Sequence, residues 1–207
     1  VRQAYLKARE CAYPPSNHTT ILARGSSRPI SALTEDLIGC YCAERAPSSA
    51  HNRVLVEPPI SFKGSALKNR SGKSALLIKP DVVLLHRDEA RVFLDIKTDL
   101  GHKRKDMFDT AQEHEALLER IKGKPAHFND GRTKAGQQMV ISSNIRSYYV
   151  VLSEGNIGKL DLEGHLERIK QLKRVGVLLL TIGDHLTLAG RQRGDAGFHA
   201  HCRQVML

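Results

Sequence analysis

The chain has 207 residues, of which 41% are hydrophobic and 26% are charged, as is typical of a soluble globular domain. Its longest apolar run, 175–182, is far shorter than the roughly 18 residues that cross a bilayer, so no membrane partner is expected. The 32 Lys and Arg residues against 22 Asp and Glu give a net charge of +10, which favours a polyanionic partner such as nucleic acid.

The order of the chain predicts one main domain with appendages. We expect a helix or arm at 1–28, a domain at 29–190 and a tail at 191–207. Cys40 and Cys42 are too close together for an ordinary zinc pair, so we expect reduced thiols in a cytoplasmic protein. The tail holds further residues of metal-binding types, His199, His201 and Cys202. The other ligands of a closed zinc site are missing, so we expect a plain tail.

The first helix is predicted over residues 29–45, where Pro29 suits the first turn. Its main stripe at helical spacing is Leu33, Leu37, Cys40, Tyr41 and Glu44. Glu35 shares the neighbouring stripe with Ile38 and Cys42. Its carboxylate is therefore expected beside the apolar face of the helix rather than opposite it.

Residues 53–62 predict a strand that Pro58 and Pro59 bend or end. In the basic segment that follows, Gly72-Lys73-Ser74 is similar to a phosphate-binding loop, but Leu67 stands where that loop needs glycine, so we exclude a nucleotide triphosphate site. Lys73 is instead a candidate contact to a nucleic acid backbone, and a solvated turn is the alternative. The same holds for the other basic residues of this segment, Lys63, Lys68 and Arg70.

Residues 78–97 are predicted to form a β-hairpin. The stretch 82–85 is apolar on both faces, which suits an interior strand, and 86–91 is a polar break. Side chains alternate along the second strand, so one face carries charges and the other is apolar: Phe93, Asp95 and Lys97 against Leu94 and Ile96.

A turn centred on Asp88 places Asp81 directly opposite Asp95 across this hairpin. Opposed residues share a face, with Cβ atoms about 5 Å apart, and two carboxylates so placed repel each other. A divalent cation removes that repulsion, and hard oxygen ligands suit magnesium or manganese. With Lys97 beside them, the two acids predict a metal site for attack on a phosphodiester.

Pro80-Asp81 followed by Asp95-Ile96-Lys97 resembles the signature of the PD-(D/E)xK phosphodiesterase superfamily. The resemblance implies a three-layer α/β/α sandwich with a central mixed β-sheet, the restriction-endonuclease-like core. It implies Mg²⁺, with Mn²⁺ as a substitute, held by Asp81, Asp95 and the backbone carbonyl of Ile96. It also implies a glutamate on the first helix facing these acids. Glu35 is the choice, Asp36 and Glu44 are the fallbacks, and a solvated helix acid is the alternative.

After the hairpin, Asp99 is a spare ligand candidate, because it would share the face of Asp95 if the strand continued. The basic run that follows is a candidate for phosphate contacts, or a solvated face: Lys103, Arg104 and Lys105. Farther on, the pattern predicts helices at 106–122 and 162–174, strands at 147–152 and 176–182, and a long loop at 123–143 that clasps nucleic acid.

These features together predict a magnesium-dependent endonuclease that hydrolyses DNA, of the restriction type. A non-catalytic nucleic-acid-binding module of the same fold, a nuclease for DNA repair or junctions, and a chance occurrence of the motif in another metal-dependent enzyme or an interaction protein remain alternatives. A cutter of palindromic sites should be a homodimer, because the symmetries of protein and site match. The target sequence cannot be read from these residues.

Overall fold

The computed structural model describes residues 31–46, 52–62, 76–97, 106–129, 135–151 and 162–179. Its helices are α2 (Ser31–Arg45), α3 (Met107–Ile121) and α4 (Leu162–Ile169). Its strands are β1 (Asn52–Val56), β2 (Ile60–Phe62), β3 (Leu76–Ile78), β4 (Val82–His86), β5 (Glu89–Lys97), β6 (Pro125–Asn129), β7 (Gly136–Val151) and β8 (Val175–Leu179). The predicted arm and tail lie outside the described residues, as do Lys73, Asp99, Lys103, Arg104 and Lys105.

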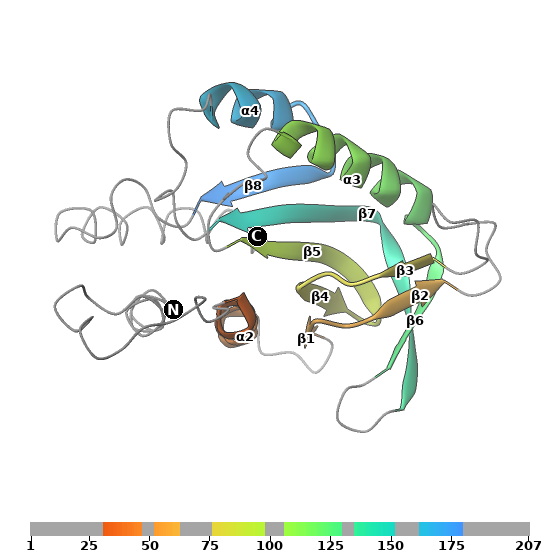
Figure 1. Cartoon of the computed structure of the whole chain (residues 1–207). Coiled ribbons are helices and arrows are strands. Elements are labelled where there is room, and N and C mark those ends of the chain that lie inside the picture. The colour runs from red at the N-terminus through yellow and green to blue at the C-terminus, as the bar shows by residue number, and fades with distance from the viewer. Residues whose placement is uncertain are drawn as a thin grey trace, which may run out of the picture.

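The described strands form one mixed sheet in the order β1-β4-β5-β7-β6-β2-β3, with β8 also paired to β7. The pairs β5–β7 and β7–β8 are parallel, and the other pairs are antiparallel. The long strand β7 joins the two halves of the sheet, because its first part pairs with β6 and its last part with β8 (Figure 1). The prediction of an α/β protein with a central mixed sheet is confirmed.

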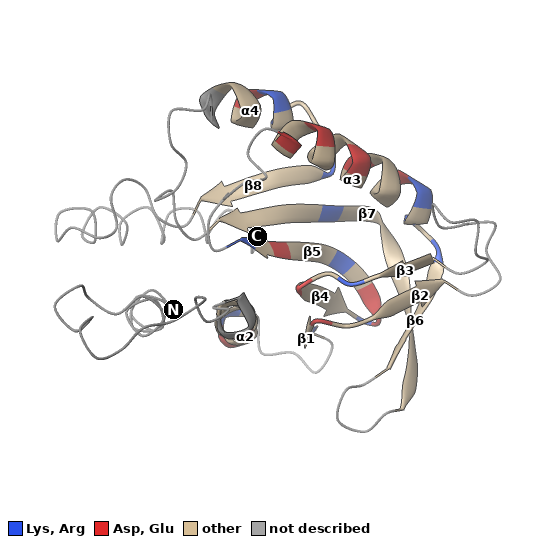
Figure 2. Ribbon diagram, in the orientation of Figure 1, with Lys and Arg blue, Asp and Glu red and all other residues tan. Residues whose placement is uncertain are grey.

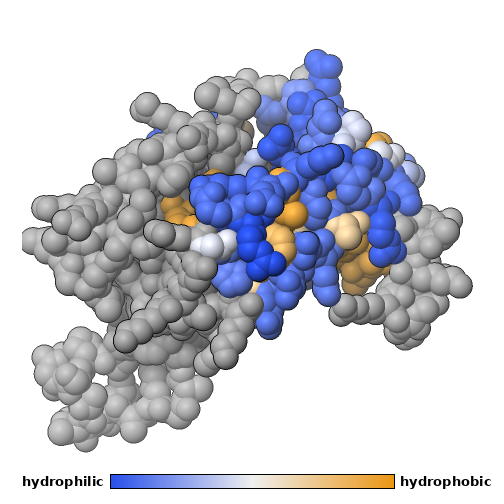
Figure 3. Space-filling view, turned by 90° about the horizontal axis from the view of Figure 1, so that it is seen from above, coloured by the Kyte–Doolittle hydropathy of each residue, from blue (hydrophilic) through white to orange (hydrophobic). Residues whose placement is uncertain are grey.

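Helices lie on both faces of this sheet (Figure 1). On one face α2 packs into a cluster that contains Ile38, Cys42, Val82, Leu94, Ile96 and Val150. On the other face α3 and α4 pack into a larger cluster that includes Val83, Phe93, Ala111, Leu118, Tyr149 and Ile169. The predicted alternation along β5 is confirmed, because Phe93 and Leu94 belong to different clusters. The outer surface over α3 and α4 is largely hydrophilic (Figure 3), as amphipathic helices require.

The hairpin of β4 and β5 turns through Arg87 and Asp88, whose φ angles of 52° and 60° are both in the left-handed region. That is the backbone of a two-residue hairpin turn. The predicted centre on Asp88 is therefore slightly wrong. However, a bulge in β5 at Arg91 shifts the pairing by one residue, so the last pair is Val82 with Leu94. Asp81 and Asp95 are the next residues outward, as predicted.

The buried stripe of α2 differs from the expected one. Glu35, Ile38 and Cys42 are buried, whereas Cys40 is exposed. Gly39 faces β1 so closely that a Cβ atom there would lie 2.6 Å from a methyl carbon of Val56. The helix therefore turns its small residue, and with it Glu35, toward the sheet.

Three other predictions were wrong in their extent. Residues 53–62 form two strands at separate places in the sheet rather than one. The predicted effect of Pro58 and Pro59 is confirmed, because this pair lies in the break between the two strands. The expected loop at 123–143 contains β6 and the start of β7, which alternate buried and exposed side chains. The last helix ends at Ile169 rather than at residue 174, and the residues after it lead directly into β8.

Candidate active site

Asp81 lies at the open end of the hairpin, directly before β4, and its carboxylate is tied to the opposite strand. Its Oδ2 accepts a hydrogen bond from the backbone N–H of Ile96 at 2.6 Å. Its own backbone carbonyl accepts from the N–H of Glu57 at 2.7 Å. These two contacts hold the carboxylate over the end of β5.

Asp95 and Lys97 project from the same face of β5, where acidic and basic positions follow one another along the strand (Figure 2). Lys97 Nζ donates to Asp95 Oδ1 at 2.5 Å. The two side chains are 33% and 30% exposed, so this ion pair remains open to a ligand from solvent. The pair joins an acid and a base at the carboxyl end of β5.

The two aspartates interact directly. Burial raises the pKa of Asp81 to about 6, the hydrogen bond from Ile96 opposes this shift, and the nearby carboxylates of Asp95 and Glu35 add to it. Asp81 is therefore partly protonated just below neutral pH. A carboxylate in this position gains from any cation that removes the repulsion.

Glu35 reaches the same site from α2. It is only 9% exposed, and burial followed by the charge of Glu57 raises its pKa, while Lys79 and Lys97 act in the opposite direction. The fallback candidates Asp36 and Glu44 are exposed. Of the three helix acids, Glu35 is therefore the one that is buried and whose charge acts on Asp81.

An exposed ion pair between Glu57 and Lys79 forms the rim of the site, with Lys79 Nζ 2.6 Å from Glu57 Oε1. Both charges act on Glu35. Neither residue was predicted as a site residue from the sequence. Glu57 lies in the break between β1 and β2, within a segment that was predicted to be a single strand.

The donor chemistry at this end of the hairpin fits magnesium. Mg²⁺ commonly takes one or two carboxylates together with waters and substrate phosphates, rather than a full protein cage. Asp81 and Asp95 provide two such carboxylates at one place. Within the described ranges, no three His, Cys, Asp or Glu side chains are grouped to hold an ion. Glu35 acts on the site through its charge, which raises the pKa of Asp81.

Two further residues border the site and were missed from the sequence. Tyr149 of β7 is in register with Asp95 on the neighbouring parallel strand. Its hydroxyl lies 3.3 Å from Nδ1 of His114 on α3, and the two rings meet edge to face with centroids 5.9 Å apart. A signal was present, because His114 occupies a position of the apolar stripe of α3, three residues after Ala111 and four before Leu118.

Comparison with known proteins does not extend these observations. No protein-family model, curated protein or solved structure matches the chain. Among the helices described, none has both the length and the hydrophobicity to span a lipid bilayer.

Proposed function

We propose that the protein is a magnesium-dependent nuclease that hydrolyses phosphodiester bonds of DNA. The observation that carries the proposal is the approach of Asp81 and Asp95 at the open end of one hairpin, with Lys97 bound to Asp95. In a structural ion pair each acid is neutralised by a base. In this site the carboxylates of Asp81 and Asp95 repel each other, and the Asp95–Lys97 pair is partly exposed to solvent. Perturbed carboxylates of this kind are concentrated at functional sites.

We further propose that the fold is the three-layer α/β/α sandwich of the restriction-endonuclease-like proteins. Support comes from the helices on the two faces of the sheet and from the hairpin that carries both halves of the motif. The protein would act in the cytoplasm and, if it cuts palindromic sites, as a homodimer.

In this proposal Asp81, Asp95 and the carbonyl of Ile96 hold Mg²⁺, and Mn²⁺ can replace it. When bound, the ion lowers the pKa of a water and offsets charge on the phosphate. Lys97 stabilises negative charge on the phosphate from its position beside Asp95. Glu35 orients a water at the site from the buried face of α2.

The choice of DNA as substrate comes from charge. A net charge of +10 attracts a polyanion, and contacts to phosphates position a backbone without reading its sequence. Lys73, Lys103, Arg104 and Lys105 are the proposed contacts outside the described ranges. Restriction, repair and junction processing share this chemistry, so the substrate forms that are cut would distinguish them.

The test is cleavage of supercoiled, linear, single-stranded and four-way-junction DNA with Mg²⁺, with Mn²⁺ and with a chelator. We expect metal-dependent cleavage that Asp95→Ala abolishes and that Asp88→Asn, at the far end of the same hairpin, leaves unchanged. Cleavage that survives Asp95→Ala would disprove the site. Binding of DNA without cleavage under all these conditions would favour a non-catalytic binding module.

A further inference from the structure

One polar residue interrupts the stripe by which α3 contacts the sheet. The rest of that stripe is buried: Met107, Ala111, Leu118 and Ile121. His114 occupies the remaining position, where a polar group costs free energy unless it is hydrogen-bonded. Its partner is the hydroxyl of Tyr149, at 3.3 Å from Nδ1. The pair is thus built into the interface between α3 and β7.

This pair lies beside the proposed catalytic acids. Tyr149 and Asp95 are register partners on adjacent parallel strands, which lie about 5 Å apart. Partners in register project from the same face of a sheet, which here is the face that α3 covers. The charge of Asp95 acts on both His114 and Tyr149. The imidazole therefore borders the site from the side opposite to α2 and Glu35.

The hydrogen bond between Nδ1 of His114 and the Tyr149 hydroxyl can form in either direction, and its direction sets which nitrogen of a neutral ring carries the proton. Burial and the charge of Asp95 raise the pKa of Tyr149, so its hydroxyl keeps its proton and can donate to Nδ1. Burial lowers the pKa of His114, which favours the neutral form of the ring. A neutral ring that accepts at Nδ1 carries its proton on Nε2.

The Nε2–H group is then a donor without a partner among the described residues. Asp95, whose charge acts on His114, is already bound to Lys97 through Oδ1. A neutral donor at this place adds no positive charge that would compete with a metal ion for the carboxylates. These properties suit an oxygen of a bound phosphodiester.

We propose that His114 is a substrate-positioning residue whose Nε2–H donates a hydrogen bond to a phosphate oxygen of DNA beside Asp95 and Lys97, and that Tyr149 holds the ring in the required tautomer. This inference rests on the proposed nuclease function. It assigns the wall of the site formed by α3 and β7 to substrate binding, and it leaves metal binding to the hairpin.

The first test does not need cleavage. The ¹⁵N resonances of the histidine rings are recorded at pH 7 in a chelator, before and after addition of a short duplex oligonucleotide. We expect His114 as the neutral form protonated on Nε2, with an Nε2 resonance that shifts on addition of DNA. Assignment uses the loss of one signal in His114→Gln. A ring protonated on Nδ1, a charged ring, or an Nε2 signal that stays in place when DNA is bound would overturn the inference.

The second test separates positioning from packing by kinetics. His114→Ala should raise the KM for DNA about tenfold, the effect of one lost hydrogen bond to a charged group. His114→Gln places an N–H near the former Nε2 and should restore most of that loss. Tyr149→Phe should raise the KM about threefold, because the tautomer is no longer fixed. His127→Ala on β6 is the matched control and should change nothing.

The outcomes distinguish the two proposals. If the wild type cuts DNA, Asp95→Ala does not, and His114→Ala equals the wild type, the inference is wrong and the nuclease remains. If the wild type never cuts DNA, the nuclease proposal is wrong. In that case the Nε2 resonance alone decides whether His114 contacts a phosphate.

Discussion

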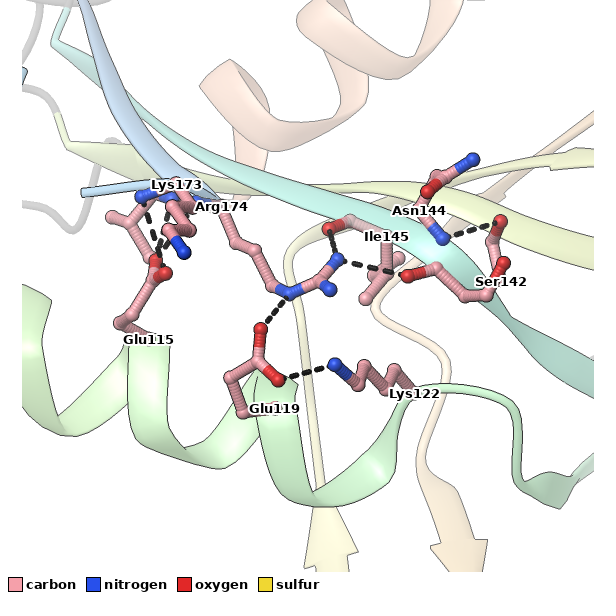
Figure 4. A network of polar contacts seen from close by, with 10 residues as sticks. Glu115, Glu119, Lys122, Ser142, Asn144, Ile145, Lys173 and Arg174 are labelled. Atoms are coloured by element: carbon pink, nitrogen blue, oxygen red, sulfur yellow. Dashed lines mark hydrogen bonds and ion pairs between the residues drawn. The ribbon is translucent and has the colours of Figure 1, made fainter.

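Two clusters of charged side chains are built on the same sheet in opposite ways. The hairpin cluster, Glu35, Asp81, Asp95 and Lys97, sets three acids near one base, and the pKa of Asp81 is raised to about 6 by burial and by its neighbours. The clamp cluster, Glu115, Glu119, Lys122 and Arg174, joins α3 to the start of β8 and to β7 (Figure 4). There, each acid accepts from several donors.

Glu115 shows how complete the clamp is. Its carboxylate accepts three backbone hydrogen bonds, from the N–H groups of Lys173, Arg174 and Val175, at 3.1, 2.9 and 3.1 Å. These residues form the turn between α4 and β8, where backbone donors would otherwise lack partners. One acid on α3 thus fixes the path of the chain into the last described strand.

Glu119 and Arg174 extend the same clamp. Glu119 is bound by Lys122 Nζ and by Arg174 Nε, each at 2.5 Å, and these hydrogen bonds lower the pKa of Glu119 to about 2. Arg174 Nη1 also donates to the carbonyls of Ser143 and Ile145, at 2.9 and 3.2 Å. Those carbonyls lie where the register of β7 against β5 shifts.

The charges of the clamp cluster are balanced within the fold, whereas those of the hairpin cluster are not. An acid with a lowered pKa has its negative charge stabilised by donors of the protein, whereas an acid with a raised pKa lacks that stabilisation. The clamp also lies next to the candidate site along α3, since His114, which borders the site, is the residue before Glu115. The clamp therefore holds the helix that borders the site.

The largest effect is expected from a lysine of the hairpin cluster. Lys97→Met should reduce the rate of DNA cleavage roughly a hundredfold to a thousandfold, the range found when one electrostatic contact to a transition state is removed. Lys122→Met in the clamp is the matched control and should keep the wild-type rate. Equal losses in both variants, measured by plasmid nicking, would show that the two clusters do not differ in function.

Glu115→Ala should destabilise the protein by about 2 kcal/mol, because several backbone N–H groups lose their acceptor together. Urea unfolding at pH 7 measures this loss. Gln112→Ala, at an exposed position of the same helix, should be nearly neutral. A Glu115→Ala variant as stable as the wild type would mean that solvent replaces these contacts.

Asp81→Asn should raise the stability of the metal-free protein at pH 7, whereas Glu115→Ala lowers it. The pKa of Asp81 rises on folding from its ordinary value of 3.8 to about 6, so the folded state binds the proton more tightly. The wild type without metal should therefore lose stability as the pH rises from about 4 to about 6, and it should not recover above that.

Asp81→Asn removes this pH slope. It should be about 1–2 kcal/mol more stable than the wild type at pH 7 without metal, after allowance for screening by solvent. Adding Mg²⁺ should stabilise the wild type and not the variant. Unfolding curves from pH 4 to pH 8 test both points, with Asp88→Asn as the control. A variant less stable at pH 7 would show that the Asp81 carboxylate is structural.

The smallest effect is expected from Glu119→Gln. The bridged carboxylate is 42% exposed, and exposed ion pairs contribute little to stability. Its thermal midpoint should fall less than that of Glu115→Ala in the same buffer, and the difference from the wild type should shrink in high salt. A larger fall than for Glu115→Ala would reverse the order of importance within the clamp.

Much of the hairpin could be predicted because its signals are local. Alternation along β5 assigned Asp95 and Lys97 to one face, and the spacing of α2 assigned Glu35 to the stripe of Ile38 and Cys42. The expected pairing of Asp81 with Asp95 also agrees with the register, although it depends on a bulge at Arg91 that was not foreseen. By contrast, β6 and the first part of β7 were mistaken for a loop, since their polar, glycine-containing sequence hides the alternation.

The sequence by itself determined which side chains share a face of a helix or a strand, because those periods follow from backbone geometry alone. It therefore indicated that Asp95 and Lys97 share a face and that Glu35 lies beside the apolar face of its helix. Only the tertiary structure decided which faces meet. The pairing of His114 with Tyr149 requires α3 to cross β7, and the clamp requires Glu115 to meet a turn about 60 residues later in the chain. Such contacts depend on the topology of the sheet, on which the local pattern carries no information.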